Sequence, residues 1–201
     1  MIRGCVKSNN AKGAIAIFYT KKRSGLIKDL KLGYLHLYYG PGVGKTTRTV
    51  GLAIRAAGKN LHVAFIQFMK SGASGEVAIL KQIPNIRYRC PGKHPFIMSC
   101  GPKAVHYEHA QKAFDQATEA VADGFEVIIC DEMLDTLIFE VLEREKLLDL
   151  MRMCKDANIE LVMTGRSTPP DFVELADYIT EFVQVKHPYY SGAKSREGIE
   201  Y

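Results

Sequence analysis

The chain has 201 residues, of which 47% are hydrophobic and 24% are charged. Such values are typical of one globular domain with a substantial core. The formal net charge is +5, yet residues 1–31 hold eight of the 27 basic side chains and one of the 22 acidic ones. The rest of the chain keeps 19 basic and 21 acidic side chains, a net charge of −2. A broad basic face for binding nucleic acid is therefore not expected.

Cysteine usage and hydropathy indicate the compartment. The five cysteines are scattered and match no disulfide framework, which favours a reducing, cytoplasmic location. The apolar run at 13–19 is too short to span a bilayer and is followed by basic residues at 21–23. It also lacks the small-residue cleavage pattern of a secretory signal. We therefore expect no membrane segment.

Residues 1–31 do not resemble the rest of the chain, and we expect them to be a basic, poorly ordered N-terminal arm. They suit a surface arm, a targeting segment or the product of an upstream translation start. Residues 32–201 are expected to form the folded domain, because from there onward short apolar runs alternate with helical patterns.

The alternation predicts the order of the elements. Strands are expected at 32–39, 61–68, 86–90, 127–130, 160–164 and 178–183. Helices are expected at 46–58, 76–82, 103–122, 142–157 and 170–175, with Gly58 ending the first as a left-handed cap. A loop rich in Pro and Gly covers 91–102. This order predicts an α/β fold, a P-loop NTPase-like three-layer sandwich with a mostly parallel central sheet.

A glycine-rich turn joins the first expected strand to the first expected helix. Its residues are Gly40, Pro41, Gly42, Val43, Gly44, Lys45, Thr46 and Thr47. Glycines let successive backbone N–H groups point into one hollow, and the helix N-terminus adds positive potential there. In such a loop the lysine reaches the outer phosphates and the following threonine hydroxyl takes Mg²⁺.

The spacing of this turn is one residue shorter than in a standard phosphate loop. Only three residues separate Gly40 from the Gly-Lys pair, and Tyr39 stands where the first glycine belongs. The alternative is a chance glycine turn before a helix. The position of the turn between a strand and a helix favours phosphate binding.

A second element matches the phosphate loop. The apolar residues 127–130 end in Asp131 and Glu132. In P-loop proteins we expect such a strand beside the loop strand, where its acid holds Mg²⁺ or orders the water around it. The alternative is a surface turn after a core strand, and the glycine loop earlier in the chain favours the magnesium role.

Two further groups of residues, a Cys/His cluster and a charged run, give weaker indications of function. Cys90, His94, Cys100, His106 and His109 crowd one region, but their spacings match no zinc pattern. We expect the last two histidines on a helix surface. The charged run at 143–146 is most simply a solvated helix face.

Taken together, several motifs resemble those of the P-loop ATP:corrinoid adenosyltransferases of cobalamin biosynthesis. The matching residues cover the chain from about residue 33 to its end. They lie at 40–47, 55–58, 67–70, 74–76, 130–132, 161–166, 174–177, 185–188, 192–194 and 198–201. The shortened loop is also a trait of that family.

The resemblance implies transfer of the 5′-deoxyadenosyl group of ATP to the Co(I) centre of a reduced corrinoid, with release of triphosphate. It implies that the loop residues 40–47 hold the triphosphate and that Lys45, Thr46 and Glu132 are catalytic. Thr46 and Glu132 would bind Mg²⁺, with Asp131 close by. Arg55 and Arg166 match family arginines, the first of them near the nucleotide.

On the corrinoid side the resemblance points to Phe96, in the loop at 91–102. The alternative is that Phe96 is an ordinary apolar anchor of that loop. The corrinoid would be cobalamin, cobinamide or cobyrinate diamide, with a reductase supplying electrons and a possible homodimer. Pro41 and Val43 depart from the family, which commonly has Asn and Lys there.

Two other functions remain open at this level. One is a P-loop kinase that transfers γ-phosphate to a small molecule. The other is a non-enzymatic nucleotide-dependent switch, for which the sequence shows no clear mobile segments that would contact the γ-phosphate.

Overall fold

The computed structural model describes residues 30–201. The predicted arm at 1–31 therefore lies almost entirely outside the described residues, and the unit described below is Lys31–Tyr201. Its six strands form one parallel sheet in the order β3-β2-β4-β5-β1-β6. The strands are β1 Leu35–Tyr39, β2 Val63–Gln67, β3 Ile86–Arg89, β4 Val127–Asp131, β5 Glu160–Gly165 and β6 Tyr178–Glu181.

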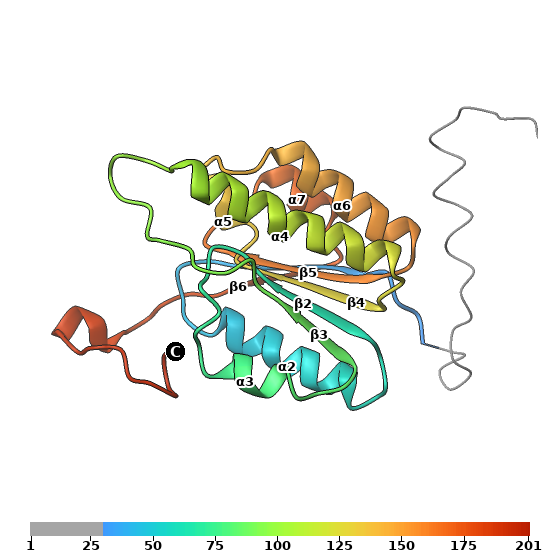
Figure 1. The fold of residues 1–201 in the computed structure, drawn as a ribbon, viewed down its shortest axis with the longest axis horizontal. Coiled ribbons are helices and arrows are strands. Elements are labelled where there is room, and N and C mark those ends of the chain that lie inside the picture. Colours follow the sequence, from blue (N-terminus) through green and yellow to red (C-terminus); the bar gives the residue numbers. More distant parts are fainter. Residues whose placement is uncertain (1–29) are drawn as a thin grey trace, which may run out of the picture. The chain divides into compact units, whose positions relative to one another are not determined.

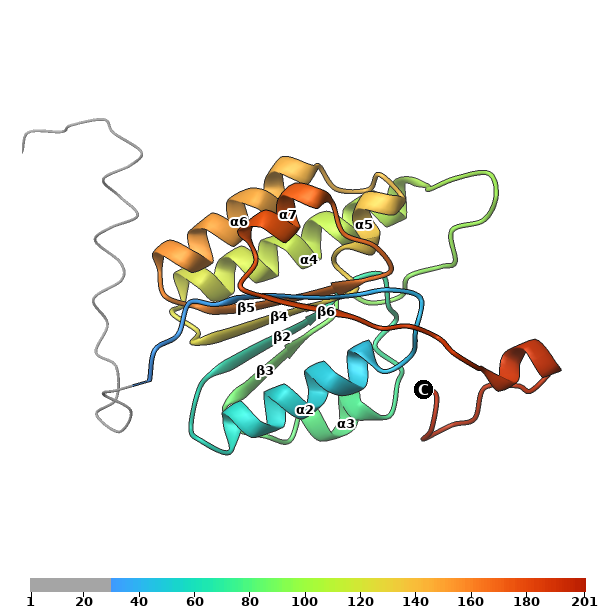
Figure 2. The same ribbon diagram turned by 180° about the vertical axis from the view of Figure 1, so that it is seen from behind.

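Helices cover both faces of this sheet (Figures 1 and 2). Helices α2 and α3 lie on one face, and α4, α5, α6 and α7 lie on the other. Their bounds are α2 Lys45–Ala57, α3 Glu76–Leu80, α4 Ala104–Ala122, α5 Asp135–Ile138, α6 Arg144–Asp156 and α7 Pro170–Leu175, with a 3₁₀ turn η2 at Pro188–Ser191. The predicted three-layer α/β fold is confirmed.

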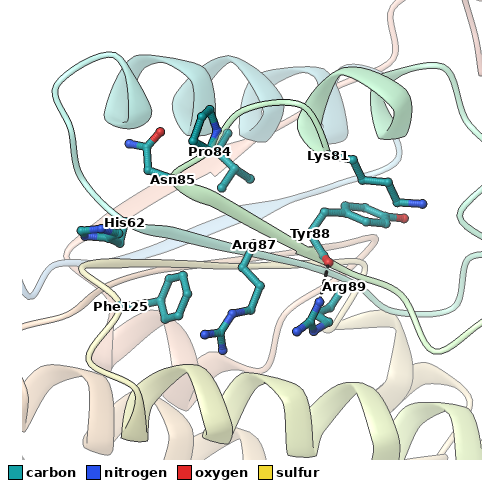
Figure 3. A pocket seen from close by; sticks show the side chains of 9 residues that line it. His62, Lys81, Pro84, Asn85, Arg87, Tyr88, Arg89 and Phe125 are labelled. Atoms are coloured by element: carbon teal, nitrogen blue, oxygen red, sulfur yellow. Dashed lines mark hydrogen bonds between the residues drawn. The ribbon is translucent and has the colours of Figure 1, made fainter.

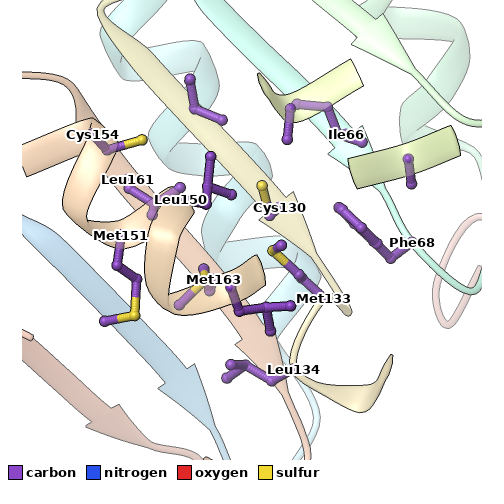
Figure 4. Close-up of a cluster of buried hydrophobic side chains, with 14 of the residues drawn as sticks. Ile66, Phe68, Cys130, Met133, Leu134, Leu150, Met151, Cys154, Leu161 and Met163 are labelled. Carbon is purple, nitrogen blue, oxygen red and sulfur yellow. The ribbon is translucent and has the colours of Figure 1, made fainter. Parts of the chain in front are cut away.

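The central strands are apolar over most of their length because both of their faces are covered. Every residue of β2 and β4 is buried, whereas the edge strand β6 is mostly exposed. Between the sheet and the larger helical layer, α6 contributes Leu150, Met151 and Cys154 to a cluster with Leu161 and Met163 of β5 (Figure 4). Burial of each large side chain here contributes roughly 1.5–3 kcal/mol. This core fixes the sheet whose carboxyl edge carries the polar residues described below.

One expectation about the helices was wrong, and one helix was missed. Gly58 is not a left-handed cap, since its φ is −63°. The chain runs two residues further, and Asn60 takes the left-handed conformation at φ 61°. The N–H of Leu61 then bonds to the carbonyl of Ala56 at 3.1 Å, and that of Asn60 to Ala57 at 2.9 Å, which closes the helix as a Schellman motif. The short helix α5 was not predicted.

The strand that ends in Asp131 was expected beside the loop strand, and that expectation was also wrong. Strand β4 pairs with β2 and β5, while β1 pairs with β5 and β6. Strand β5 therefore lies between the two phosphate-site strands. The carboxyl ends of all the parallel strands still meet at one edge, so Asp131 can reach the start of α2 across the end of β5.

Candidate active site

The glycine loop is held by backbone contacts from two other strands. The N–H of Gly40 bonds to the carbonyl of Arg166 after β5 at 3.2 Å, and the N–H of Gly42 bonds to that of Phe182 after β6 at 2.7 Å. A Cβ atom at Gly40 would lie 2.5 Å from the Phe182 oxygen, and one at Gly42 would lie 2.7 Å from it. Side chains are therefore excluded at both positions by the segment that follows β6.

The loop lysine is folded back over its own loop. The Lys45 ammonium donates to the carbonyl oxygens of Gly40 at 2.6 Å and Gly42 at 2.7 Å. It also lies 6.0 Å from the centroid of the Phe182 ring. Burial is the main cause that lowers the pKa of Lys45, opposed by the carboxylates of Asp135 and Glu132. The ammonium thus lies within the bend where a phosphate is expected.

Asp131 is the centre of a buried polar cluster. Its carboxylate is completely buried and accepts the Thr46 hydroxyl on both oxygens at 3.1 Å. The hydroxyl of Thr164 donates to it at 3.0 Å, and the Lys70 ammonium lies 2.7 Å away. Gln67 adds a weaker amide contact at 3.4 Å. The structure therefore brings together Thr46 and Asp131, two of the three residues expected to hold Mg²⁺.

Glu132, the third of them, has an unusual backbone. Its φ is 62°, a conformation that is uncommon for residues other than glycine. The Thr164 hydroxyl accepts its N–H at 2.8 Å, and its carboxylate lies 3.5 Å from the Lys70 ammonium. Burial, reinforced by the nearby charges of Asp131 and Asp135, raises the pKa of Glu132 to about 7, although Lys70 opposes the shift.

Arg166 and Asp135 border the loop on the β5 side. The Arg166 N–H donates to the Asp135 carboxylate at 2.5 Å, and its guanidinium Nε lies 3.8 Å from the other oxygen. The guanidinium is largely exposed, so it is free to meet a ligand over the loop. A Cβ atom at Gly165 would lie 2.7 Å from the same carboxylate. Glycine at this position therefore lets Asp135 approach β5.

Arg55 is not brought to this site. It lies in the last turn of α2, ten residues after Lys45, which is about 15 Å along the helix axis. Its expected role near the nucleotide stays a prediction, and Arg55 is left out of the site proposed below.

The loop at 91–102 presents apolar side chains to solvent close to the same edge. Phe96 is 92% exposed and Met98 is 65% exposed. The loop follows β3, so it leaves the sheet at the carboxyl end, as does the segment after β6 (Figures 1 and 2). The role of Phe96 toward a corrinoid stays a prediction.

His106 and His109 are buried on α4, which corrects the expectation of a helix surface. The Nε2 of His106 donates to the Pro95 carbonyl at 3.0 Å. The Nε2 of His109 donates to the carbonyls of Gly92 at 3.2 Å and Lys70 at 3.1 Å. These two rings fix the loop at 91–102, and Lys70 in the segment after β2, to helix α4. Within residues 30–201, no three His, Cys, Asp or Glu side chains are grouped closely enough to hold a metal ion by themselves.

Lys70, Gln67, Thr164 and Phe182 were not singled out as site residues from the sequence. The available signal was positional, because each lies at or just beyond the carboxyl end of a parallel strand, where ligands of α/β proteins bind. The hollow of about 420 Å³ beside edge strand β3 lies elsewhere and contains none of the expected residues (Figure 3).

Comparisons with known proteins agree with this geometry. Residues 31–201 match the family model described as ATP:corrinoid adenosyltransferase BtuR/CobO/CobP. The corrinoid adenosyltransferase of Pseudomonas aeruginosa is 30% identical over 172 residues, covering 84% of each chain. That of Escherichia coli K12 is 26% identical over 171 residues, covering 84% of this chain and 86% of the relative.

A further relative, the corrinoid adenosyltransferase of a Sinorhizobium species, is 27% identical over 172 residues, with 84% of this chain and 80% of the relative covered. Among the described helices, none is both long and apolar enough to cross a bilayer. The fold, the phosphate loop and the match along residues 31–201 lead to one conclusion. This chain belongs to the ATP:corrinoid adenosyltransferase family.

Proposed function

We propose that the chain transfers the 5′-deoxyadenosyl group of ATP to the Co(I) centre of a reduced corrinoid and releases triphosphate. Co(I) supplies the electron pair of the new cobalt–carbon bond, the bond between C5′ and its oxygen breaks, and the triphosphate leaves with that pair. The observation that carries this proposal is the pairing of a phosphate loop with an exposed apolar loop at one sheet edge, in a chain of this family.

The phosphate loop would hold the leaving group. The first N–H groups of α2 have no partners within the helix, and the bend just before them holds the Lys45 ammonium. We expect the ammonium to exchange its loop carbonyls for phosphate oxygens. Lys45 and these N–H groups would then stabilise the negative charge that grows on the triphosphate as its bond to C5′ breaks. Arg166, exposed on the other rim, would contribute a second positive charge.

The polar cluster beyond the loop suits Mg²⁺. The Thr46 hydroxyl and the carboxylates of Asp131 and Glu132 are hard oxygen donors. The Lys70 ammonium lies among these oxygens, so the cluster already accommodates a cation. Bound there, Mg²⁺ would screen the charge of the triphosphate. The Thr164 hydroxyl would hold Glu132 in place, because it accepts the backbone N–H of Glu132.

The loop at 91–102 would receive the corrinoid. Phe96 and Met98 offer apolar contacts, and His106 holds the loop at Pro95. A group that displaces the lower ligand of cobalt would favour the four-coordinate state that is reduced to Co(I), and Phe96 is our candidate. The remaining requirement is positioning, because cobalt and C5′ must be held in line at near-contact distance. A reductase and a homodimer remain part of the proposal, and a cytoplasmic location is proposed with them.

The experiment is incubation of the protein with ATP, Mg²⁺ and chemically reduced cobalamin without oxygen. The visible spectrum follows the corrinoid, and the phosphate products are separated. Adenosylated corrinoid with triphosphate supports the proposal. ADP would indicate a kinase, and no product would indicate a binding protein; either result would overturn it.

Variants test the site itself. Lys45→Ala and Glu132→Ala should each lower turnover at least about a hundredfold, because each removes an interaction with the charge of the leaving group. Lys59→Ala, which changes an exposed lysine beyond the far end of α2, is the matched control and should keep full activity. Melting curves of all three variants show whether the fold is kept. Full activity in the two site variants would contradict the assignment.

A further inference from the structure

The Lys70 ammonium lies at the centre of the oxygens assigned above to Mg²⁺. Its Nζ is 2.8 Å from the Thr46 hydroxyl oxygen, 2.7 Å from an Asp131 oxygen and 3.5 Å from a Glu132 oxygen. The side chain is 19% exposed, although lysine is almost never buried without a partner. A positive charge therefore already occupies the place between these three groups.

The backbone of Lys70 is fixed while its ammonium is carried on a flexible stem. The Lys70 carbonyl accepts the Nε2–H of His109 at 3.1 Å and the thiol of Cys90 at 3.2 Å. His109 bonds in addition to Gly92, at the base of the loop at 91–102. A lysine side chain has four methylene groups and a compact head that can be relocated without moving the backbone.

Charge balance explains why a cation is needed there before any ligand binds. Three carboxylates, those of Asp131, Glu132 and Asp135, lie near one another in a largely buried region, and the charge of Glu76 also acts on Lys70. The cations beside them are Lys45, Lys70 and Arg166, so without Lys70 the carboxylates would clearly outnumber the cations. Lys45 is bonded to its own loop, which leaves Lys70 as the cation in contact with Asp131. Uncompensated buried carboxylates would be costly.

The ammonium and a divalent ion cannot share these oxygens. Mg²⁺ requires close oxygen ligands in near-octahedral geometry, and two cations at hydrogen-bonding distance would repel each other strongly. The Thr46 hydroxyl also accepts from Lys70 with the oxygen that would face a metal ion. Binding of the divalent ion therefore requires the ammonium to leave.

We propose that Lys70 is a tethered cation that fills the divalent-ion site of the nucleotide-free protein and is displaced when the metal–nucleotide complex binds. The proposal rests on the function proposed above, since it takes the metal ligands from there. Once displaced, the ammonium would stay close to the incoming triphosphate, because its stem is held at the same backbone position. The carboxylates are thus paired with a cation in both states, with the Lys70 ammonium in the nucleotide-free protein and with the divalent ion in the complex.

The test measures Mn²⁺ binding to the nucleotide-free protein by electron paramagnetic resonance of the free ion. Lys70→Met removes the ammonium. Lys70→Gln also removes the charge but keeps a polar head that can donate to Asp131, and it is the second variant in case Lys70→Met folds poorly. Both should bind Mn²⁺ about tenfold or more tightly than the unmodified protein, because a competing charge has gone. In EDTA both variants should have a lower melting temperature than the unmodified protein. Addition of Mn²⁺ should raise the melting temperature of the variants by more than it raises that of the unmodified protein.

Controls identify the site and separate the two proposals. Lys59→Met should leave Mn²⁺ affinity unchanged, and Thr46→Val added to Lys70→Met should abolish the gain. Equal or weaker Mn²⁺ binding in both Lys70 variants would overturn the inference, as would a gain that survives Thr46→Val. Adenosyl transfer by the unmodified protein decides the proposed function independently, since it is measured without any change at Lys70.

Discussion

Thr164 offers the sharpest test of how the acidic cluster is held. Its buried hydroxyl donates to Asp131 at 3.0 Å and accepts the N–H of Glu132 at 2.8 Å. Thr164→Val keeps the shape of the side chain and removes both bonds. A hydrogen bond to a charged group contributes about 1.5–3 kcal/mol, and an orphaned buried N–H costs about 1–3 kcal/mol. Allowing for about 1 kcal/mol of better apolar burial, we expect a net loss of roughly 2–4 kcal/mol in the free energy of unfolding.

The loss should be visible in urea and thermal unfolding. For a domain of this size, about 3 kcal/mol corresponds to a fall of roughly 6–12 °C in melting temperature. Thr180→Val is the matched control, since Thr180 is half-buried on edge strand β6. It should change the stability by less than about 0.5 kcal/mol. If Thr164→Val were as stable as the control, the hydroxyl would not hold the two acids, and the account of the left-handed backbone at Glu132 would be wrong.

Two further predictions concern glycines of the phosphate loop and of α2, and the histidine His94. Gly51→Ala and Gly42→Ala should have opposite effects on thermal stability, because a Cβ at Gly51, in the middle of α2, meets nothing within 4 Å, whereas one at Gly42 would lie 2.7 Å from the backbone after β6. We expect Gly51→Ala to raise the free energy of unfolding by about 0.5–1 kcal/mol and Gly42→Ala to lower it. Equal changes in the two variants would contradict the close approach of the backbone after β6 to Gly42. The second prediction concerns pH: burial, then the charges of His109 and His106, lowers the pKa of His94 from 6.5 to about 4. Below pH 6.5 the unfolded chain thus binds more protons than the folded one, so the free energy of unfolding should fall as the pH drops toward 4. The protection of the amides at 91–102 against hydrogen exchange should fall with it. The acid sensitivity should weaken in His94→Asn; unchanged sensitivity would exclude His94 as its source.

Much of the fold could be predicted from the pattern of the chain. The predicted helix at 170–175 matches α7, Pro170–Leu175, because the proline at its first turn fixes its start. The strand at 127–130 matched β4 within one residue because a strand covered on both faces shows a continuous apolar run, here followed by the buried Asp131. The cap of α2 was missed because Gly58 and Asn60 both suit the left-handed conformation, and only the bond from Leu61 to Ala56 decides between them.

The site divides in the same way. The phosphate loop is local in sequence, so Gly40, Gly44, Lys45 and Thr46 could be identified from their order and spacing. Lys70 could not, because its partner Asp131 is 61 residues away and the contact exists only after β2 and β4 pair. The burial of the α4 histidines was missed for a related reason. Their partners are carbonyl groups, which carry no signal in the sequence.

The amino-acid sequence by itself determined the family and the parallel α/β fold, and it predicted the phosphate-binding turn, since each depends on neighbours along the chain or on repeating apolar spacing. Only the tertiary structure decided that β5 lies between β1 and β4, and that the Lys70 ammonium lies among Thr46, Asp131 and Glu132. The physical reason is that strand order and long-range polar contacts are set by how the sheet edge is assembled. No short stretch of sequence carries that information.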